Sequence, residues 1–284
     1  MFGFLNVYKP QGKTSHDVVA ILRRITKIKQ IGHTGTLDPF AEGVLPICIG
    51  KATRLIEYLD DDKAYIGTVQ FGKSTTTYDI EGADVNFSEK KVTLEEIEEA
   101  LSSFCGEIEQ LPPIYSAIKV NGKKLYEYAR KGEEVKIEPR KVNIYRLELI
   151  NFDYEKQTAE LLIECSKGTY IRSIANDLGE KLSCYGHLIK LVRSKAGLFE
   201  IDNSIKLDDL QSIEQIEKNL IYPLNYINYP EYELSQSQFE KVSHGNPIQT
   251  DLLLDGIVIF TYQGKLVAMA DVSDKIAKVS KVFI

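Results

Sequence analysis

Residues 32–43 form a loop-like segment whose side chains could take part in acid–base or nucleophilic chemistry. The segment reads GHTGTLDPFAEG, and its three glycines and small hydroxyl residues would let the backbone approach a ligand closely. It carries a carboxylate directly before a proline, Asp38, and one histidine, His33. An isolated Asp-Pro pair more often only starts a turn, and a loop histidine more often caps a backbone group. The loop alone therefore leaves both the chemical and the structural interpretation open.

Metal and disulfide chemistry are not indicated by the histidines and cysteines. The four histidines are not spaced as the paired ligands of common metal motifs: His16, His33, His187 and His244. The four cysteines form no C-x-x-C pair and lie mostly in apolar runs: Cys48, Cys105, Cys165 and Cys184. We therefore expect no metal and free, mostly buried thiols, as in a protein of the reducing cytosol.

Two stretches partly match the phosphate-binding P-loop pattern G-x-x-x-x-G-K-[ST]. Residues 67–74 (GTVQFGKS) satisfy the pattern, but the stretch is itself strand-like and no helical pattern follows it. Residues 12–14 (GKT) do lie between a predicted strand and a predicted helix, but Val7 stands where the first glycine belongs. A P-loop needs both the glycines and the helix N-terminus, so nucleoside triphosphate binding is not expected.

The elements that must position these residues are mixed in type. Apolar residues recur at helical spacing after Ser15, a candidate N-cap, and again over residues 170–182. Thr93 and Glu96 form a capping box for a third helix that Gly106 is expected to end. Strand patterns cover residues 64–71, 142–150 and 158–165. Because no regular βαβ alternation occurs, we expect an α+β fold with a mixed, mainly antiparallel sheet flanked by helices.

The last part of the chain has a different character. Residues 222–232 carry two prolines and four tyrosines and are typical of a linker. Next comes a predicted short helix, with Ser235 and Gln238 as its capping box and Gly245 at its end. Strand-like runs follow over residues 256–260, 265–270 and 277–283. We therefore expect one large domain over residues 1–227 and a small β-barrel over residues 228–284.

Charge is unevenly distributed along the 284 residues, whose formal net charge is −6. Residues 1–58 contain eight basic and four acidic side chains, and residues 113–146 contain nine basic and four acidic ones. Electrostatic fields act locally, so the acidic sum does not exclude a nucleic-acid partner. No apolar run is long enough to cross a bilayer and no signal peptide is visible, so a cytoplasmic protein is expected.

Five segments, in order along the chain, together resemble the motifs of one enzyme family. One of them is the loop described above, with the sequence HTGTLDP over residues 33–39 and GVLP over residues 43–46. The other four are residues 7–15 (VYKPQGKTS), residues 63–65 (KAY) with Asp79 and Gly82, residues 167–173 (KGTYIRS) and residues 188–195 (LIKLVRSK). The sequence thus resembles the TruB family, the tRNA pseudouridine-55 synthases, and the resemblance extends to the C-terminal module.

The resemblance implies a cofactor-free and metal-free isomerase that converts uridine to pseudouridine in the T-loop of tRNA. Asp38 matches the essential aspartate, which would attack either C1′ of the nucleoside or the base. Arg172 matches the arginine that would keep this carboxylate charged and oriented. Tyr65 would stack on the extruded base and could transfer a proton at C5, although its strand position equally fits core packing.

Other residues are assigned supporting roles by the same resemblance. Tyr170 and Leu191 would enclose the flipped uracil, and His33 would help displace the uridine from the RNA stack. Lys9 and Pro10 would buttress the active-site loop without taking part in the chemistry.

The basic stretch at residues 119–141 corresponds in the family to an insertion that clamps the T-arm. Its candidate RNA-contacting residues are Lys119, Lys123, Lys124, Arg130 and Lys131. The C-terminal module resembles a PUA domain that would touch the acceptor stem. We expect a monomer that needs no protein partner; the alternatives are a guide-RNA-dependent synthase subunit and a non-catalytic tRNA-binding or chaperone protein.

Overall fold

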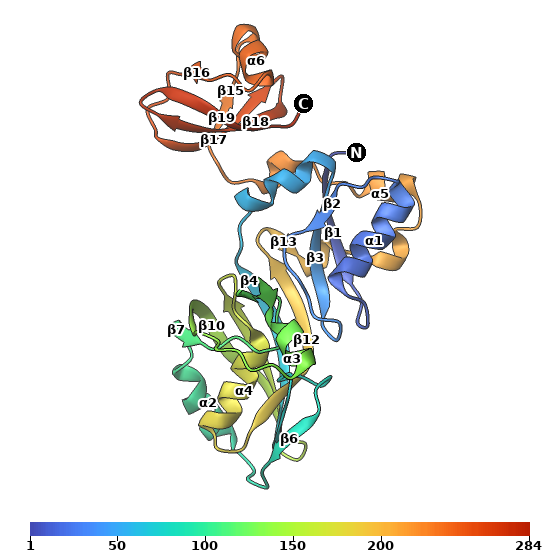
Figure 1. Ribbon diagram of the computed structural model, residues 1–284, viewed down its shortest axis with the longest axis vertical. Helices are drawn as coiled ribbons and strands as arrows, with labels where there is room; N and C mark the ends of the chain where they lie inside the picture. The colour runs from blue at the N-terminus through green and yellow to red at the C-terminus, as the bar shows by residue number, and fades with distance from the viewer.

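The computed structural model describes residues 1–284 as an elongated molecule built on one long twisted sheet, with a separate small sheet at one end (Figure 1). The expected α+β class is confirmed, because helices cover a mixed sheet whose pairings are mainly antiparallel. A core cluster of 37 buried residues fills the space between this sheet and its helices. None of the helices combines the length and apolar composition that a membrane crossing requires.

The large sheet consists of two mainly antiparallel parts joined by one short parallel pairing, and the edge strand β14 also pairs in parallel with β1. Its strand order is β14-β1-β3-β12-β4-β11-β10-β7, with β2 paired to β3 and β13 to β12. β3 and β12 meet in parallel over only two residue pairs, Val192 with Glu42 and Arg193 with Gly43. The ten strands are β1 (Gly3–Lys9), β2 (Ile31–His33), β3 (Glu42–Ile49), β4 (Lys63–Phe71), β7 (Gly106–Gln110), β10 (Arg140–Asp153), β11 (Thr158–Cys165), β12 (Gly186–Ala196), β13 (Phe199–Glu200) and β14 (Ile205–Lys206).

The helix α1 (Ser15–Thr26) packs its apolar residues against the first part of the sheet. The expected helix is present, but the expected N-cap is wrong by one residue. Thr14 is the N-cap and forms a capping box with Asp17. The Ser15 hydroxyl is occupied elsewhere, since it accepts a hydrogen bond from the amide of Leu37 at 2.8 Å and donates to the carbonyl of Leu37.

Two helices cover the other part of the sheet. The capping box of Thr93 and Glu96 is confirmed at the start of α2 (Leu94–Ser102), but this helix ends at Ser102 and not at Gly106. Gly106 instead begins β7, with a φ of +89° that favours glycine. The third predicted helix is α4 (Ile171–Lys181), which Tyr170 precedes as N-cap.

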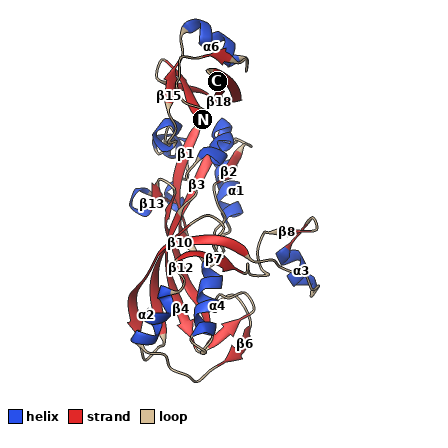
Figure 2. Ribbon diagram, turned by 90° about the vertical axis from the view of Figure 1, so that its left-hand side faces the viewer, coloured by secondary structure: helices blue, strands red, loops and turns tan.

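Shorter elements project from the sheet or connect its strands. Residues 111–139 leave the sheet between β7 and β10 and stand out from the side of the molecule (Figure 2). The residues of the P-loop match lie in β4 and β5, so no phosphate-binding loop is present there. The shorter elements are η1 (Gly50–Tyr58), β5 (Lys73–Thr75), β6 (Asp84–Phe87), β8 (Lys119–Val120), β9 (Lys123–Lys124), α3 (Leu125–Lys131), η2 (Ile201–Asn203), η3 (Leu207–Asp209), α5 (Ile213–Lys218) and η4 (Pro223–Tyr226).

The C-terminal residues form a curled five-stranded sheet in the order β15-β17-β18-β19-β16, a half-barrel of PUA-like form. The predicted capping box of Ser235 and Gln238 and the predicted strand hairpin are confirmed. A 14-residue apolar cluster joins this module to the rest of the chain, since it includes both Leu55 of η1 and Met269 of β18. The elements are β15 (Glu231–Glu233), α6 (Gln236–Ser243), β16 (Ile248–Gln249), β17 (Gly256–Tyr262), β18 (Lys265–Ser273) and β19 (Ile276–Val282).

Candidate active site

A cavity of about 750 Å³ opens where the two parts of the large sheet meet. This volume lies in the range of small-ligand sites, which is about 300–1,000 Å³. Segments far apart in sequence contribute to it: the β2–β3 loop, strands β4 and β12, the start of α4 and the base of the projecting segment. Six of the predicted residues line it together: Asp38, Tyr65, Arg130, Tyr170, Arg172 and Leu191.

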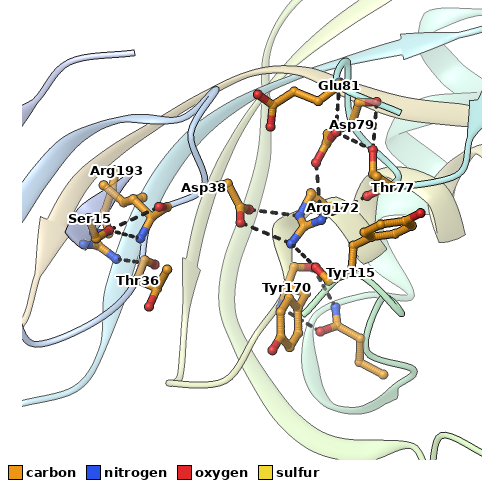
Figure 3. A network of polar contacts seen from close by, with 12 residues as sticks. Ser15, Thr36, Asp38, Thr77, Asp79, Glu81, Tyr115, Tyr170, Arg172 and Arg193 are labelled. Atoms are coloured by element: carbon orange, nitrogen blue, oxygen red, sulfur yellow. Dashed lines mark hydrogen bonds and ion pairs between the residues drawn. The ribbon is translucent and has the colours of Figure 1, made fainter. Parts of the chain in front are cut away.

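Asp38 and Arg172 form a two-point ion pair at the centre of this cavity (Figure 3). The Arg172 Nε atom lies 2.9 Å from one carboxylate oxygen of Asp38, and Nη2 lies 3.3 Å from the other. The Arg172 side chain is buried, whereas a third of the Asp38 side chain is open to the cavity. This geometry holds one carboxylate in a fixed orientation with an accessible edge.

The same guanidinium is held by a second carboxylate and two backbone carbonyls. Arg172 Nη1 lies 3.3 Å from an oxygen of buried Asp79 and donates to the Thr77 carbonyl, while Nη2 donates to the Tyr115 carbonyl at 3.1 Å. Asp79 itself accepts hydrogen bonds from the Thr77 hydroxyl and the Glu81 amide. Arg172 is therefore fixed from the β5–β6 turn, from the projecting segment and from the loop of Asp38.

The cavity shifts the acidity of Asp38. Desolvation by the cavity wall raises the pKa of Asp38 above its ordinary value, and the neighbouring Asp79 carboxylate raises it further. The guanidinium of Arg172 and the ammonium of Lys9 oppose this rise. Asp38 is thus a carboxylate whose charge depends on its cationic partner.

The loop that carries Asp38 is supported from below by a buried lysine. Lys9 is fully buried at the end of β1, and its Nζ donates to the carbonyls of Pro10, Lys13 and Pro39. Desolvation lowers the pKa of Lys9 to about 8. Lys9 and Pro10 do not line the cavity, so their geometry is that of a loop support.

Tyr65, Tyr170 and Leu191 form apolar walls of the cavity. Tyr65 and Leu191 are buried on the adjacent strands β4 and β12, and burial raises the pKa of the Tyr65 phenol. Tyr170 is held through its backbone, because the buried side chain of Gln110 accepts from the Tyr170 amide at 2.7 Å and donates to its carbonyl at 3.0 Å. Flat and branched apolar side chains on these walls are suited to enclosing a planar ring.

His33 is not among the residues that line the cavity. It lies at the end of β2, half-buried, and its Nδ1 atom is buried with no hydrogen-bond partner. Desolvation and the Arg193 guanidinium lower the pKa of His33, so it is neutral at physiological pH.

The basic residues expected on the projecting segment are only partly brought to the site. Arg130 lines the cavity, together with Tyr126 from the same helix, whereas Lys119, Lys123, Lys124 and Lys131 do not. Arg130 and Lys124 both lie over the Tyr126 ring, at 5.3 and 5.4 Å from its centroid. Leu125 of this segment is fully buried and Tyr128 is largely buried, which the irregular sequence pattern did not indicate.

Comparison with known proteins shows which family has sequences like that of this chain. The model described as "TruB family pseudouridylate synthase (N terminal domain)" matches residues 23–171, and "tRNA pseudouridylate synthase B C-terminal domain" matches residues 172–227. The "tRNA pseudouridine synthase B" of Caldanaerobacter subterraneus subsp. tengcongensis is 46% identical over 92% of this chain and 90% of its own length.

The chain belongs to the TruB family. The "tRNA pseudouridine synthase B" of Limosilactobacillus reuteri is 40% identical and covers 100% of this chain and 99% of its own.

Solved structures of more distant proteins share the TruB fold. A Cbf5–Nop10–Gar1 complex contains a chain that is 25% identical, with a TM-score of 0.76 over 100% of this chain and 85% of that one. An H/ACA RNP bound to a substrate RNA contains another, 23% identical with a TM-score of 0.74, over 100% and 85% of the two chains. The second likeness concerns the fold alone.

Among the charged residues that line the cavity of this TruB-family chain, Asp79 and Arg193 were not predicted as site residues from the sequence. Asp79 was noticed only as part of a motif, since nothing in the sequence indicated that it would meet Arg172. Arg193 lines the cavity from β12, and a signal for it was readable: it falls two residues after Leu191, on the inward-facing positions of an alternating strand. No group of three or more His, Cys, Asp or Glu side chains is arranged to hold a metal ion.

Proposed function

We propose that this TruB-family chain isomerises a uridine of tRNA, at position 55 in the T-loop, to pseudouridine. The reaction breaks the C1′–N1 bond, forms a C1′–C5 bond and moves one proton from C5 to N1, so it consumes no other reactant. The observation that supports it most directly is the Asp38–Arg172 ion pair inside a nucleoside-sized cavity, in a chain 46% identical to a tRNA pseudouridine synthase B.

Asp38 is the reactive group in this proposal. Its accessible carboxylate edge is the group that attacks the flipped nucleoside, at C1′ or at the base. Arg172 favours the ionised form of Asp38 and fixes the direction from which it attacks. Asp79 and the two backbone carbonyls keep Arg172 from turning away as the charge on Asp38 changes during the reaction.

The walls of the cavity hold the uracil while its bond to the sugar is broken. Tyr65, Tyr170 and Leu191 enclose the ring, and Tyr65 is also the candidate for proton transfer at C5. Flipping a base out of its stack costs a few kcal/mol, and these contacts offset part of that cost. His33, at the end of β2 where the loop that carries Asp38 begins, is assigned to the displacement of the uridine from the stack.

The RNA is bound by surfaces on both sides of the cavity. The projecting segment carries most of a clamp, residues 119–141, whose basic and tyrosine side chains suit phosphate contact and stacking. Residues 1–227 form the catalytic domain, and residues 228–284 form a PUA-like domain that contacts the acceptor stem.

Replacing Asp38 by Asn tests the assignment. The variant keeps the size of the side chain but removes the nucleophile, so pseudouridine formation in a T-arm transcript should fall by at least about 10³-fold. Mapping of pseudouridine after reaction with the purified chain measures the product, and filter binding measures the affinity for the transcript. Binding should be retained, and normal turnover by the variant would contradict the proposal.

A guide-RNA-dependent activity is the second candidate, because the 25% identical structural neighbour is part of a Cbf5–Nop10–Gar1 complex. The two candidates differ in what the isolated chain can do. Pseudouridine formed in a tRNA transcript by this chain alone supports the tRNA synthase. Tight binding without product supports a guide-dependent or non-catalytic protein.

A further inference from the structure

Arg193 is an unusual buried charge at the edge of the cavity. It is the largest of the fully buried side chains, with 1% of its surface exposed. The ion pairs around the cavity join Arg172 to Asp38 and Asp79, and Asp61 to Lys63 and Lys167; none of them includes Arg193. Burying an unpaired guanidinium is costly, so it requires compensating hydrogen bonds and is uncommon as plain core packing.

The hydrogen bonds of Arg193 go to the loop that carries Asp38. Its Nε donates a buried hydrogen bond to the Val44 carbonyl at 2.7 Å, and Nη2 donates to the Gly35 carbonyl at 3.1 Å. A longer contact of 3.5 Å joins Nη1 to the Thr36 carbonyl. Gly35 and Thr36 precede Asp38 and Val44 follows it, so one guanidinium joins the two ends of the Asp38 loop. Figure 3 shows Arg193 on the opposite side of Asp38 from Arg172.

The backbone of Arg193 is as closely fitted to this loop as its side chain. Gly43, which pairs with Arg193 in the short parallel junction, has a φ of +106°. A Cβ atom at Gly43 would lie 2.3 Å from the Arg193 carbonyl oxygen, so only glycine fits there. β12 and the end of the loop are therefore held at fixed distance at this point.

Arg193 also lies beside Tyr65, which forms part of the cavity wall. It pairs with Tyr65 across β4 and β12, so the two side chains leave the sheet on the same face. The guanidinium lowers the pKa of Tyr65, against the stronger effect of burial. One buried residue thus contacts the loop that carries Asp38 and pairs with Tyr65.

We propose that Arg193 is a positioning residue of the isomerisation, which fixes the Asp38 loop relative to Tyr65 by joining the carbonyls on both sides of Asp38. This inference rests on the proposed function of the cavity. The role depends on the planar fork of arginine, because its separate nitrogens reach acceptors on two stretches of backbone at once. A lysine at this position would keep the charge but could not span both ends of the loop.

The test compares Arg193→Lys and Arg193→Gln with the wild-type chain on a tRNA transcript. Displacing reacting groups by about 1 Å costs about 10²-fold in rate, so kcat should fall about 30-fold or more in Arg193→Lys and about 100-fold or more in Arg193→Gln. The Kd for tRNA should stay within about threefold, because the buried residue does not reach the RNA-binding surface. Arg146→Gln is the matched control, since Arg146 is a half-exposed arginine of β10 whose pairs are Glu148 and Glu164.

The outcomes separate this inference from the proposed function. An inactive wild-type chain overturns the function itself and leaves Arg193 without a reaction to serve. With an active wild type, three results overturn the inference: kcat of Arg193→Gln within threefold of wild type, full rescue by Arg193→Lys, or loss of the folded state in both variants by circular dichroism. The last result would make Arg193 a residue of the core and not of the reaction.

Discussion

At the scale of single residues, the main feature is that one guanidinium serves two carboxylates. Arg172 contacts Asp38 and Asp79 with three of its nitrogen–oxygen pairs at 2.9–3.3 Å, and the three side chains together carry one negative charge when all are ionised. Desolvation is the main reason why the pKa of Asp38 is raised although an arginine touches it, and the Asp79 carboxylate adds to the rise. The second carboxylate therefore helps to hold Arg172 rigidly, but it also makes ionisation of Asp38 less favourable.

The pH dependence of the rate should report this balance. Because the pKa of Asp38 is raised, its protonation begins at a higher pH than for an ordinary aspartate, and the rate should fall as pH decreases through that value. Asp79→Asn removes the neighbouring negative charge, so the pKa of Asp38 should drop and the acid limb should move to lower pH. Single-turnover rates on a tRNA transcript between pH 4 and 8 measure the position of the limb.

A control separates this effect from a general change in charge. Asp84→Asn removes a half-exposed carboxylate of β6 that pairs with Lys73, and it should leave the acid limb unchanged. An acid limb of Asp79→Asn at higher pH than in the wild type would contradict the argument.

At the scale of elements, α4 is the part of the fold most constrained by the site. Its first turn carries Arg172 and follows Tyr170, which Gln110 holds at the point where the clamp leaves the sheet. The Ser173 hydroxyl donates to the Leu111 carbonyl at 2.9 Å, again at the base of the clamp. The start of this helix thus connects the Asp38–Arg172 pair to the segment proposed to bind RNA.

The middle of α4 carries a carboxylate that makes stability depend on pH. Desolvation raises the pKa of Asp177 from 3.8 to about 6 in the folded chain. The stability that this group contributes is therefore fully present below about pH 4 and is lost as pH rises through 6. Asp177→Asn removes this loss, so relative to wild type it should gain about 1 kcal/mol between pH 4 and pH 8.

Urea unfolding at pH 4, 6 and 8 checks this prediction. The comparison between pH values matters more than the absolute difference, because the substitution also changes the contact with Asn176. A pH-independent difference between the two chains would mean that Asp177 titrates normally in the folded state.

At the scale of the whole molecule, the chain forms an elongated body in which an apolar cluster joins the C-terminal module to the rest of the chain. The cluster shared by η1 and the C-terminal sheet includes Leu55, Met269 and Phe283, and Phe2 packs against Phe283 with ring centroids 5.9 Å apart. Hydrogen bonds reinforce this contact, from Arg54 to the Val282 carbonyl and from the Leu266 amide to the Tyr222 hydroxyl. The C-terminal module is therefore packed against the rest of the chain, while residues 111–139 project from the side of the molecule (Figure 2).

The salt dependence of tRNA binding should reveal the contribution of the clamp despite the net charge of −6. Each phosphate contact contributes about 0.7–0.9 to the slope of log K against log salt concentration. Replacing all five clamp cations with Gln should therefore make the slope less steep by up to about 4: Lys119, Lys123, Lys124, Arg130 and Lys131. Filter binding between 50 and 300 mM KCl measures it.

The control for this prediction replaces two exposed cations outside the clamp. Lys91 and Lys156 pair with Glu155 and Asp153, respectively, and their replacement with Gln should leave the slope unchanged. Equal slopes for the clamp variant and the wild type would assign RNA binding to other surfaces.

The local sequence by itself determined the element types and the family. Period-two and helical patterns located the main strands and helices, because burial of one face imposes those periods on the chain. It also identified Asp38, Arg172 and Tyr65 through motifs with glycines and prolines at fixed positions. The N-cap at Ser15 and the helix end at Gly106 were wrong, because the Ser15 hydroxyl bonds a distant backbone segment and Gly106 begins a strand.

Only the tertiary structure decided how the charges of the site are shared. Asp79 reaches Arg172 from 93 positions earlier in the chain, and Arg193 reaches the Gly35 carbonyl across 158 positions. Such contacts depend on strand order and on the short parallel junction between β3 and β12, which no local pattern encodes. The sequence determines which side chains are present, whereas distance-dependent electrostatics and burial depend on the folded arrangement that brings them together.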